Sequence, residues 1–118
     1  MEVSLEQKDI LSNKKLLNTI KDYARLFNTQ ESCGLIVEKL SGVSFIECEN
    51  LSENPKYHFE IDPKIFIENK VLYVYHSHVN SSAKPSKLDK KMCDELCIPY
   101  LIYSLRDDDF YLYENISV

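Results

Sequence analysis

The residues from Tyr75 to Asp89, YHSHVNSSAKPSKLD, bring together side chains of the types that bind metal ions. His76 and His78 are two positions apart and follow VLYVY, a run that predicts a buried central strand. Residues two apart in a strand point to the same side of the sheet, so both imidazoles would project together from the strand's C-terminal end. Two imidazoles on one face can bind a single ion, and imidazole is a standard zinc ligand.

Ser86 and Asp89 are three positions apart at the start of a helical pattern, SKLDKKMCDEL. The simplest interpretation is a capping box, with Ser86 as the N-cap and Asp89 in the first turn, where the helix dipole favours an acidic residue. This is compatible with a metal site, since an aspartate held at a helix start is a well-placed third ligand. Three protein ligands leave a fourth zinc position for water, whose pKa zinc lowers to about 7.

Other metal-binding families also use a His-x-His pair, and the sequence argues against four of them. A cupin needs a nearby Glu and an all-β chain, and an amidohydrolase barrel needs more than about 200 residues. A zinc-helix protease needs His-Glu-x-x-His, which is absent from the chain. A zinc deaminase needs His-x-Glu and Pro-Cys-x-x-Cys, whereas Cys93 and Cys97 are four positions apart.

Helical and strand patterns alternate along the chain, which indicates a layered α/β domain with a mixed sheet. Helices are expected over residues 14–27, from Asp62 and Pro63 onward, and after Ser86, with Leu88, Met92, Cys93 and Leu96 as the apolar stripe of the last. Strands are expected at 32–40, 43–49, 57–61, 71–78, 100–105 and 110–114. A Ser-Gly turn would join the first two strands, and SLEQ near the N-terminus could form a further capping box.

Composition and charge limit the classes of partner and the cellular compartment that we expect for this chain. The net charge is −5 and no basic stripe stands out, which argues against nucleic acid as a partner. No apolar run is long enough to span a membrane, and MEVSLEQKDI lacks the apolar core of a signal peptide, so we expect cytoplasmic free thiols. Cys93 and Cys97 would share a helix face, as core residues or as half of a metal site. His58, beside aromatic residues in YHFEI, is interpreted as structural.

The candidate residues together resemble a known motif. E…HSH-x7-SxxD, formed by Glu31, His76, Ser77, His78, Ser86 and Asp89, resembles the JAMM motif of the MPN+ zinc metalloproteases. QESCGLIVEK, FEIDP and IPYLIYSL are similar to segments of the compact prokaryotic and phage tail-assembly members. The resemblance covers roughly residues 14–114 and implies a single JAMM/MPN metallopeptidase domain over 1–118. The implied fold is the cytidine-deaminase-like three-layer α/β/α arrangement with a mixed central sheet.

The resemblance also implies roles for these residues. His76, His78 and Asp89 would ligate Zn²⁺, and Glu31 would deprotonate the zinc-bound water and then protonate the leaving amine. Ser86 would stabilise the oxyanion of the tetrahedral intermediate. Val79 stands where many members have proline, which leaves the ligand positions intact but the shape of the following loop open.

The implied function is a zinc-dependent metallopeptidase or isopeptidase that hydrolyses an amide bond. Its substrate would be a protein or peptide: a phage tail protein during tail assembly, or a ubiquitin-like sulfur carrier in a bacterium. The expected place is the bacterial or infected host cytoplasm, or the virion tail. The chain has no room for the insertions with which eukaryotic deubiquitinases grip ubiquitin. The competing class is a non-catalytic MPN scaffold in an assembly, but such domains usually lack a motif residue and none is lacking here.

Overall fold

The structure is a computed structural model that describes residues 9–114. The capping box expected at SLEQ, residues 4–7, therefore lies outside the described residues. In chain order the elements are η1 (Asp9–Ser12), α2 (Lys14–Leu26), β1 (Cys33–Lys39), β2 (Gly42–Cys48), α3 (Pro63–Glu68), β3 (Lys70–His78), α4 (Lys87–Leu96), β4 (Tyr100–Ser104) and β5 (Asp109–Tyr113).

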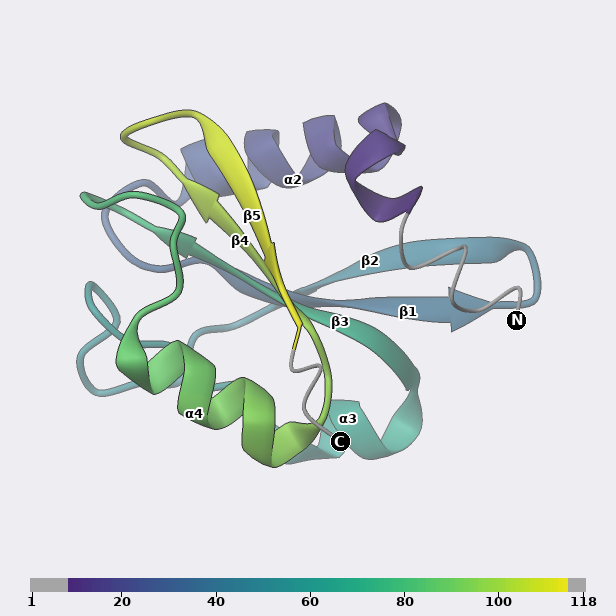
Figure 1. Cartoon of the computed structure of the whole chain (residues 1–118). Helices are drawn as coiled ribbons and strands as arrows, with labels where there is room; N and C mark the ends of the chain where they lie inside the picture. Colours follow the sequence, from purple (N-terminus) through teal and green to yellow (C-terminus); the bar gives the residue numbers. More distant parts are fainter. Residues whose placement is uncertain (1–8, 115–118) are drawn as a thin grey trace.

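A single five-stranded sheet forms the middle layer, in the order β2-β1-β3-β4-β5. Strands β3 and β4 are parallel and are connected through α4, while every other neighbouring pair is antiparallel. Helix α2 lies on one face of the sheet, and α3 and α4 lie on the other (Figure 1). The predicted three-layer arrangement with a mixed central sheet is confirmed.

The N-cap of helix α2 is Asn13, whose side chain accepts a hydrogen bond from the Leu16 N–H. Its buried face consists of Ile20, Tyr23 and Ala24, and these pack into the core cluster on that side of the sheet. The Tyr23 hydroxyl lies 3.0 Å from the carbonyl oxygens of both Cys33 and Cys48. Helix α2 is thereby tied to the point where β1 starts and β2 ends.

Strand β3 is the central strand, and its side chains alternate between the two core clusters. Tyr75 packs towards α2, whereas Val74 packs into the cluster beneath α3 and α4. His76 and His78 have the same parity as Val74, so they point to the α4 side of the sheet. The strand thus places both imidazoles at its C-terminal end, in the layer between the sheet and α4.

The strand expected at YHFEI, residues 57–61, is wrong, because the segment is irregular. Its backbone groups are bonded to the preceding loop instead of a neighbouring strand. The His58 carbonyl accepts from Asn50 Nδ2 and the Glu60 N–H donates to Asn50 Oδ1, while the His58 N–H donates to the Asn54 carbonyl and the Glu60 carbonyl accepts from the Leu51 N–H. The structural role expected for His58 is also wrong, since its side chain is exposed and lines a surface groove.

All four cysteines are free thiols, as expected. Cys93 is fully buried in the core cluster, whereas Cys97 is exposed at the left-handed C-terminal cap of α4. The core interpretation is therefore confirmed for Cys93 and wrong for Cys97. Among the described residues, no helix has the length and apolar character needed to cross a membrane.

Candidate metal centre

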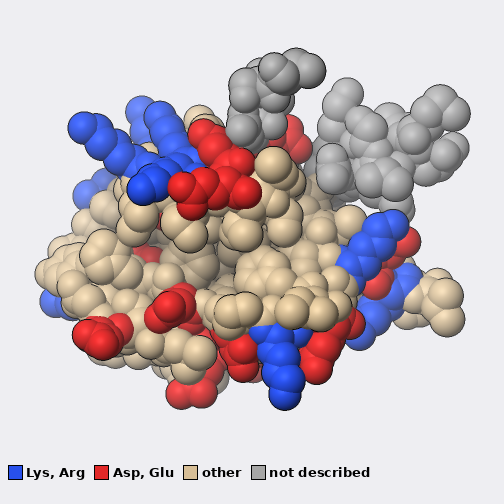
Figure 2. Space-filling view, turned by 90° about the horizontal axis from the view of Figure 1, so that it is seen from below, with Lys and Arg blue, Asp and Glu red and all other residues tan. Residues whose placement is uncertain are grey.

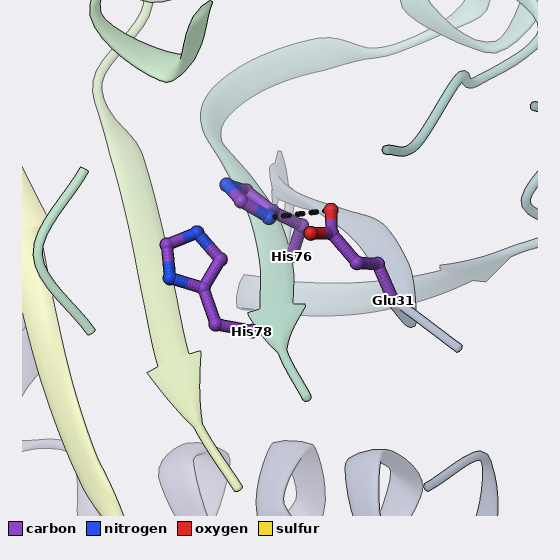
Figure 3. A group of neighbouring side chains, drawn as sticks. All are labelled: Glu31, His76 and His78. Carbon is purple, nitrogen blue, oxygen red and sulfur yellow. Dashed lines mark ion pairs between the residues drawn. The ribbon is translucent and has the colours of Figure 1, made fainter. Parts of the chain in front are cut away.

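The end of β3 places His76 and His78 side by side, with ring centroids 5.0 Å apart. Figure 3 shows both imidazoles projecting from this strand and the Glu31 side chain approaching His76 from a neighbouring segment. His76 is completely buried, and His78 and Glu31 are each 7% exposed. Candidate ligand atoms of these three residues all lie within 4.8 Å of one another, so one ion could contact all three.

Hydrogen bonding settles which nitrogen of His78 is available to a metal. His78 Nδ1 lies 2.7 Å from the Ser82 carbonyl oxygen, and because a carbonyl only accepts, Nδ1 must carry the hydrogen. In the neutral ring the lone pair is then on Nε2. This is the arrangement in which a second partner fixes the tautomer of a metal-binding histidine.

Asp89 reaches both imidazoles from the first turn of α4. Its Oδ1 lies 3.1 Å from His76 Nε2, and its Oδ2 lies 3.0 Å from His78 Nε2. Ser86 is the N-cap of the helix, and the capping box expected there is present: the Ser86 N–H donates to Asp89 Oδ2, and the Asp89 N–H donates to Ser86 Oγ. The cap therefore orients the carboxylate towards the histidines. Ser86 Oγ accepts in this box, which leaves its own hydrogen to donate elsewhere.

Glu31 lies just before β1, two residues ahead of Cys33, which pairs with His76 across the sheet. Its Oε1 is 3.3 Å from His76 Nδ1, whereas Asp89 contacts the other ring nitrogen, Nε2. The structure thus brings together five residues of the motif from three parts of the chain: Glu31, His76, His78, Ser86 and Asp89. Two carboxylates contact His76, and Asp89 alone contacts both rings.

The charges around His76 affect its pKa more than its burial does. Burial by itself lowers the pKa of His76, but the close carboxylates of Asp89 and Glu31 raise it to about 9. Burial raises the pKa of Asp89, whereas the interactions with His76 and His78 hold it well below its usual range. The favoured state of these residues without a metal therefore has a proton on an imidazole, held between carboxylates.

These residues fit a metal ion. Within the described chain, neither ring nitrogen of His76 forms a hydrogen bond of good geometry, despite the nearby carboxylates. The lone pair of neutral His78 on Nε2 also faces a carboxylate oxygen, so the centre requires a cation among its acceptors. A proton or a metal can supply that charge, and imidazole and carboxylate are both zinc ligands. Neighbouring ligand atoms around tetrahedral zinc lie about 3.3 Å apart for bonds of about 2.0 Å. The imidazole nitrogens and carboxylate oxygens lie 3.0 to 3.3 Å apart, close to that value.

Comparison with known proteins places this centre in a family. The family described as prokaryotic homologs of the JAB domain matches residues 13–113, a range that contains the whole motif. The chain belongs to this family. The small α/β domain with its mixed sheet agrees with the JAB/MPN-like fold, and the family part of the sequence-based resemblance is confirmed.

This JAB-domain protein is similar to two known proteins over most of its own length, but over different shares of theirs. "Tail tip assembly protein K" of Escherichia phage N15 is 30% identical over 100 residues, which cover 81% of this chain and 41% of that protein. This chain thus spans less than half of that curated relative. The solution structure of protein DSY2949 from Desulfitobacterium hafniense has 25% sequence identity and a TM-score of 0.65, over 84% of this chain and 77% of that one.

A large apolar groove runs beside the centre of the JAB domain. It has a volume of about 1150 Å³ and contains Glu31, His78, Ser86 and Asp89 together with side chains of α3, α4 and the 56–61 segment. Figure 2 views the molecule from the side of α3 and α4 and shows uncharged surface across the middle, with charged side chains mainly around the margin. The groove holds several exposed apolar side chains: Tyr57, Ile67, Leu88, Met92 and Leu96.

The apolar stripe expected on α4 is therefore only partly a core face. Cys93 is buried, but Leu88, Met92 and Leu96 are each between 38% and 47% exposed and line the groove. Contiguous exposed apolar surface next to polar groups is typical of binding sites. Helix α4 thus contributes both a carboxylate of the centre and one wall of the groove.

Sequence reasoning missed Phe59, whose ring stacks on His76 with centroids 4.4 Å apart and an interplanar angle of 16°. Phe59 also packs against Tyr100 in the core cluster of that side. Its position in the alternating run YHFEI suggested a strand residue, and this pattern concealed its contact with the centre.

The metal-free JAB domain should lose stability as the pH rises from about 6.5 to 9. The pKa of His76 is raised in the folded state, so its contribution is complete below the unfolded value of 6.5 and is lost through about 9. The expected loss is about 3 kcal/mol in the free energy of unfolding, measured with urea in the presence of a chelator. Asp89 has the opposite pH dependence. Because its pKa is lowered in the folded state, the stability that its carboxylate contributes is lost as the pH falls below 3.8. A His76→Gln variant should lack the alkaline loss; an equal loss in that variant would contradict the assignment.

Proposed function

We propose that this protein is a zinc-dependent metallopeptidase or isopeptidase that hydrolyses an amide bond. The observation that carries the proposal is that two buried imidazoles contact the Asp89 carboxylate beside a groove that can hold a peptide. We assign the zinc ligands as His76, His78 and Asp89. Asp89 contacts Nε2 of both rings, whereas Glu31 contacts His76 alone, at Nδ1.

Each remaining motif residue has a role in the proposed reaction. Zinc at this centre would supply a water of pKa about 7 as the nucleophile. Glu31 accepts the proton of that water and passes it to the leaving amine. Ser86 donates its hydroxyl hydrogen to the oxyanion that develops on the scissile carbonyl. The groove beside α4 orients the substrate chain across these groups.

The substrate is proposed to be a protein of a phage tail. The support is the relative named as a tail tip assembly protein, together with a groove volume larger than that of most small-molecule sites. The protein would then work with other tail components, in the infected cell or on the virion.

The deciding experiment measures zinc and hydrolysis together. Purified protein should contain about one zinc per chain, and the zinc-loaded form should cleave tail proteins encoded by neighbouring genes, with the new termini located by mass spectrometry. A protein that binds no zinc would refute the proposal. Zinc binding without cleavage of any tail protein or reporter peptide would favour a non-catalytic scaffold.

Met92→Glu should weaken substrate binding without changing the metal centre. Met92 is 38% exposed on the groove wall, so a substrate side chain can cover it, and a charge at this position would have to be desolvated. We expect KM to rise about tenfold, equivalent to about 1.4 kcal/mol, with the zinc content unchanged. Leu40→Glu is the matched control, because Leu40 is fully exposed between β1 and β2 and does not line the groove. Equal KM values in the two variants would show that this wall does not contact the substrate.

A further inference from the structure

The polar loop NLSENPK, which follows β2, contains a side chain with five hydrogen-bonding contacts. Asn50 Nδ2 lies 2.8 Å from the Glu31 carbonyl oxygen, 3.0 Å from that of His58 and 3.4 Å from that of Pro55. Asn50 Oδ1 accepts from the N–H groups of Ser52 and Glu60, at 3.0 and 3.1 Å. One partly buried amide thus connects residue 31 with both sides of the 50–60 loop.

These contacts fix the orientation of the amide. Three carbonyl oxygens surround one end of the Asn50 side chain, and two backbone N–H groups face the other. Carbonyls only accept and N–H groups only donate, so the reversed amide would place oxygen against oxygen and nitrogen against nitrogen. Only an amide of this length can serve both ends, and a carboxylate would turn an oxygen towards three carbonyls.

The first consequence concerns Glu31. Its carbonyl accepts from Asn50, and its N–H donates to the Pro55 carbonyl at 2.7 Å, so both backbone polar groups of Glu31 are bonded to the loop. Asn50 also contacts the Pro55 carbonyl, which joins the two bonds into one unit. The position of the Glu31 backbone next to His76 therefore depends on the loop, and the loop is held by Asn50.

The second consequence concerns Phe59. The two residues that flank it, His58 and Glu60, are both bonded to Asn50 through their backbones. The Phe59 ring stacks on His76, while the Glu31 carboxylate faces His76 at Nδ1. Asn50 thus holds, on the same amide, two of the groups that contact His76 from outside β3 and α4.

We infer that Asn50 is a positioning residue, which sets Glu31 at the reacting water and Phe59 against the His76 ring. The inference rests on the proposed function, in which Glu31 is the general base. Asn50 itself does not line the groove, and it bonds to the backbone carbonyl of Glu31 and not to its carboxylate. Its effect would reach the reaction only through the placement of these two residues, so it should change the rate of the chemical step and leave zinc binding intact.

The test compares Asn50→Asp with Asn54→Asp in the zinc-loaded protein. Asn54 lies in the same loop and is exposed, so its substitution makes the same change in charge without touching the five contacts. For Asn50→Asp we expect a fall in kcat of about 100-fold, as a displacement of about 1 Å can produce, with zinc content retained and KM changed much less. Asn54→Asp should match the wild type.

A second measurement is independent of catalysis. Amide hydrogen exchange, followed by NMR, should accelerate at Glu31 in Asn50→Asp and remain as in the wild type in Asn54→Asp. If Asn50→Asp does not fold, the shorter and uncharged Asn50→Ser takes its place with the same expectations.

The outcomes separate the inference from the proposed function. Unchanged kcat and unchanged exchange at Glu31 in a folded Asn50 variant would overturn the inference while the hydrolase proposal stands. If the zinc-loaded wild type hydrolyses nothing, the proposed function falls. In that case the rate of amide hydrogen exchange at Glu31 decides whether Asn50 positions the Glu31 backbone. An exchange rate in the Asn50 variant equal to that of the wild type would refute this positioning role.

Discussion

Glu31→Gln is expected to keep its zinc and to lose about 100- to 10,000-fold in kcat, the usual contribution of a general acid–base residue. Glutamine has nearly the same shape and retains an oxygen acceptor, so the packing beside His76 is preserved. It cannot accept the proton of the attacking water. The measurement is metal content and peptide hydrolysis on the same preparation, with Tm recorded to verify folding.

Glu38→Gln is the matched control for this variant. Glu38 also lies in the β1 region, but it is exposed and forms a surface ion pair with Lys70, so its loss should leave kcat unchanged. Loss of zinc from Glu31→Gln would instead make Glu31 a ligand, which the spacing of its carboxylate from both histidines permits. Full activity with zinc present would remove Glu31 from the mechanism.

Local sequence patterns predicted the parts of the centre that depend on neighbouring residues. The two-residue spacing of His76 and His78 determines their common face in any strand, and the spacing of Ser86 and Asp89 determines the capping box. Both features were confirmed because the interactions that create them extend over four residues or fewer.

Glu31 could not be placed by such patterns. It lies 45 positions before His76, and the two are brought together by the antiparallel pairing of β1 with β3, in which Cys33 is opposite His76. Pairing between distant strands depends on the packing of the whole sheet, so only the resemblance to a known motif pointed to this glutamate. Its role as the base remains a prediction.

The 50–60 loop shows where sequence patterns mislead. YHFEI alternates as a strand does, yet its backbone groups bond to the preceding loop, in part to the side chain of Asn50, eight to ten positions earlier. The α4 stripe is similar, since helical spacing identifies the apolar face but not whether protein or solvent covers it. Nothing local in the sequence separates a groove wall from a core face.

The second large effect is expected for Asp89→Asn, which should abolish the stabilisation of the protein by zinc. For the wild type at a zinc concentration of 100 times Kd, binding adds about 2.7 kcal/mol to the free energy of unfolding. For a chain of this size that corresponds to a rise in Tm of about 10 °C. The asparagine oxygen can still accept from the Ser86 N–H, so the start of α4 is retained while the negative charge facing both histidines is lost.

Asp94→Asn on the same helix makes the same chemical change at an exposed position, and it should keep the full zinc-dependent rise in Tm. Calorimetric scans with zinc and with chelator on both variants provide the comparison. A wild-type zinc shift in Asp89→Asn would exclude this aspartate as a ligand. If Glu31→Gln also lost its zinc, the two carboxylates would exchange roles. Glu31 would complete the ligand set, and Asp89, the other buried carboxylate of the centre among residues 9–114, would accept the proton.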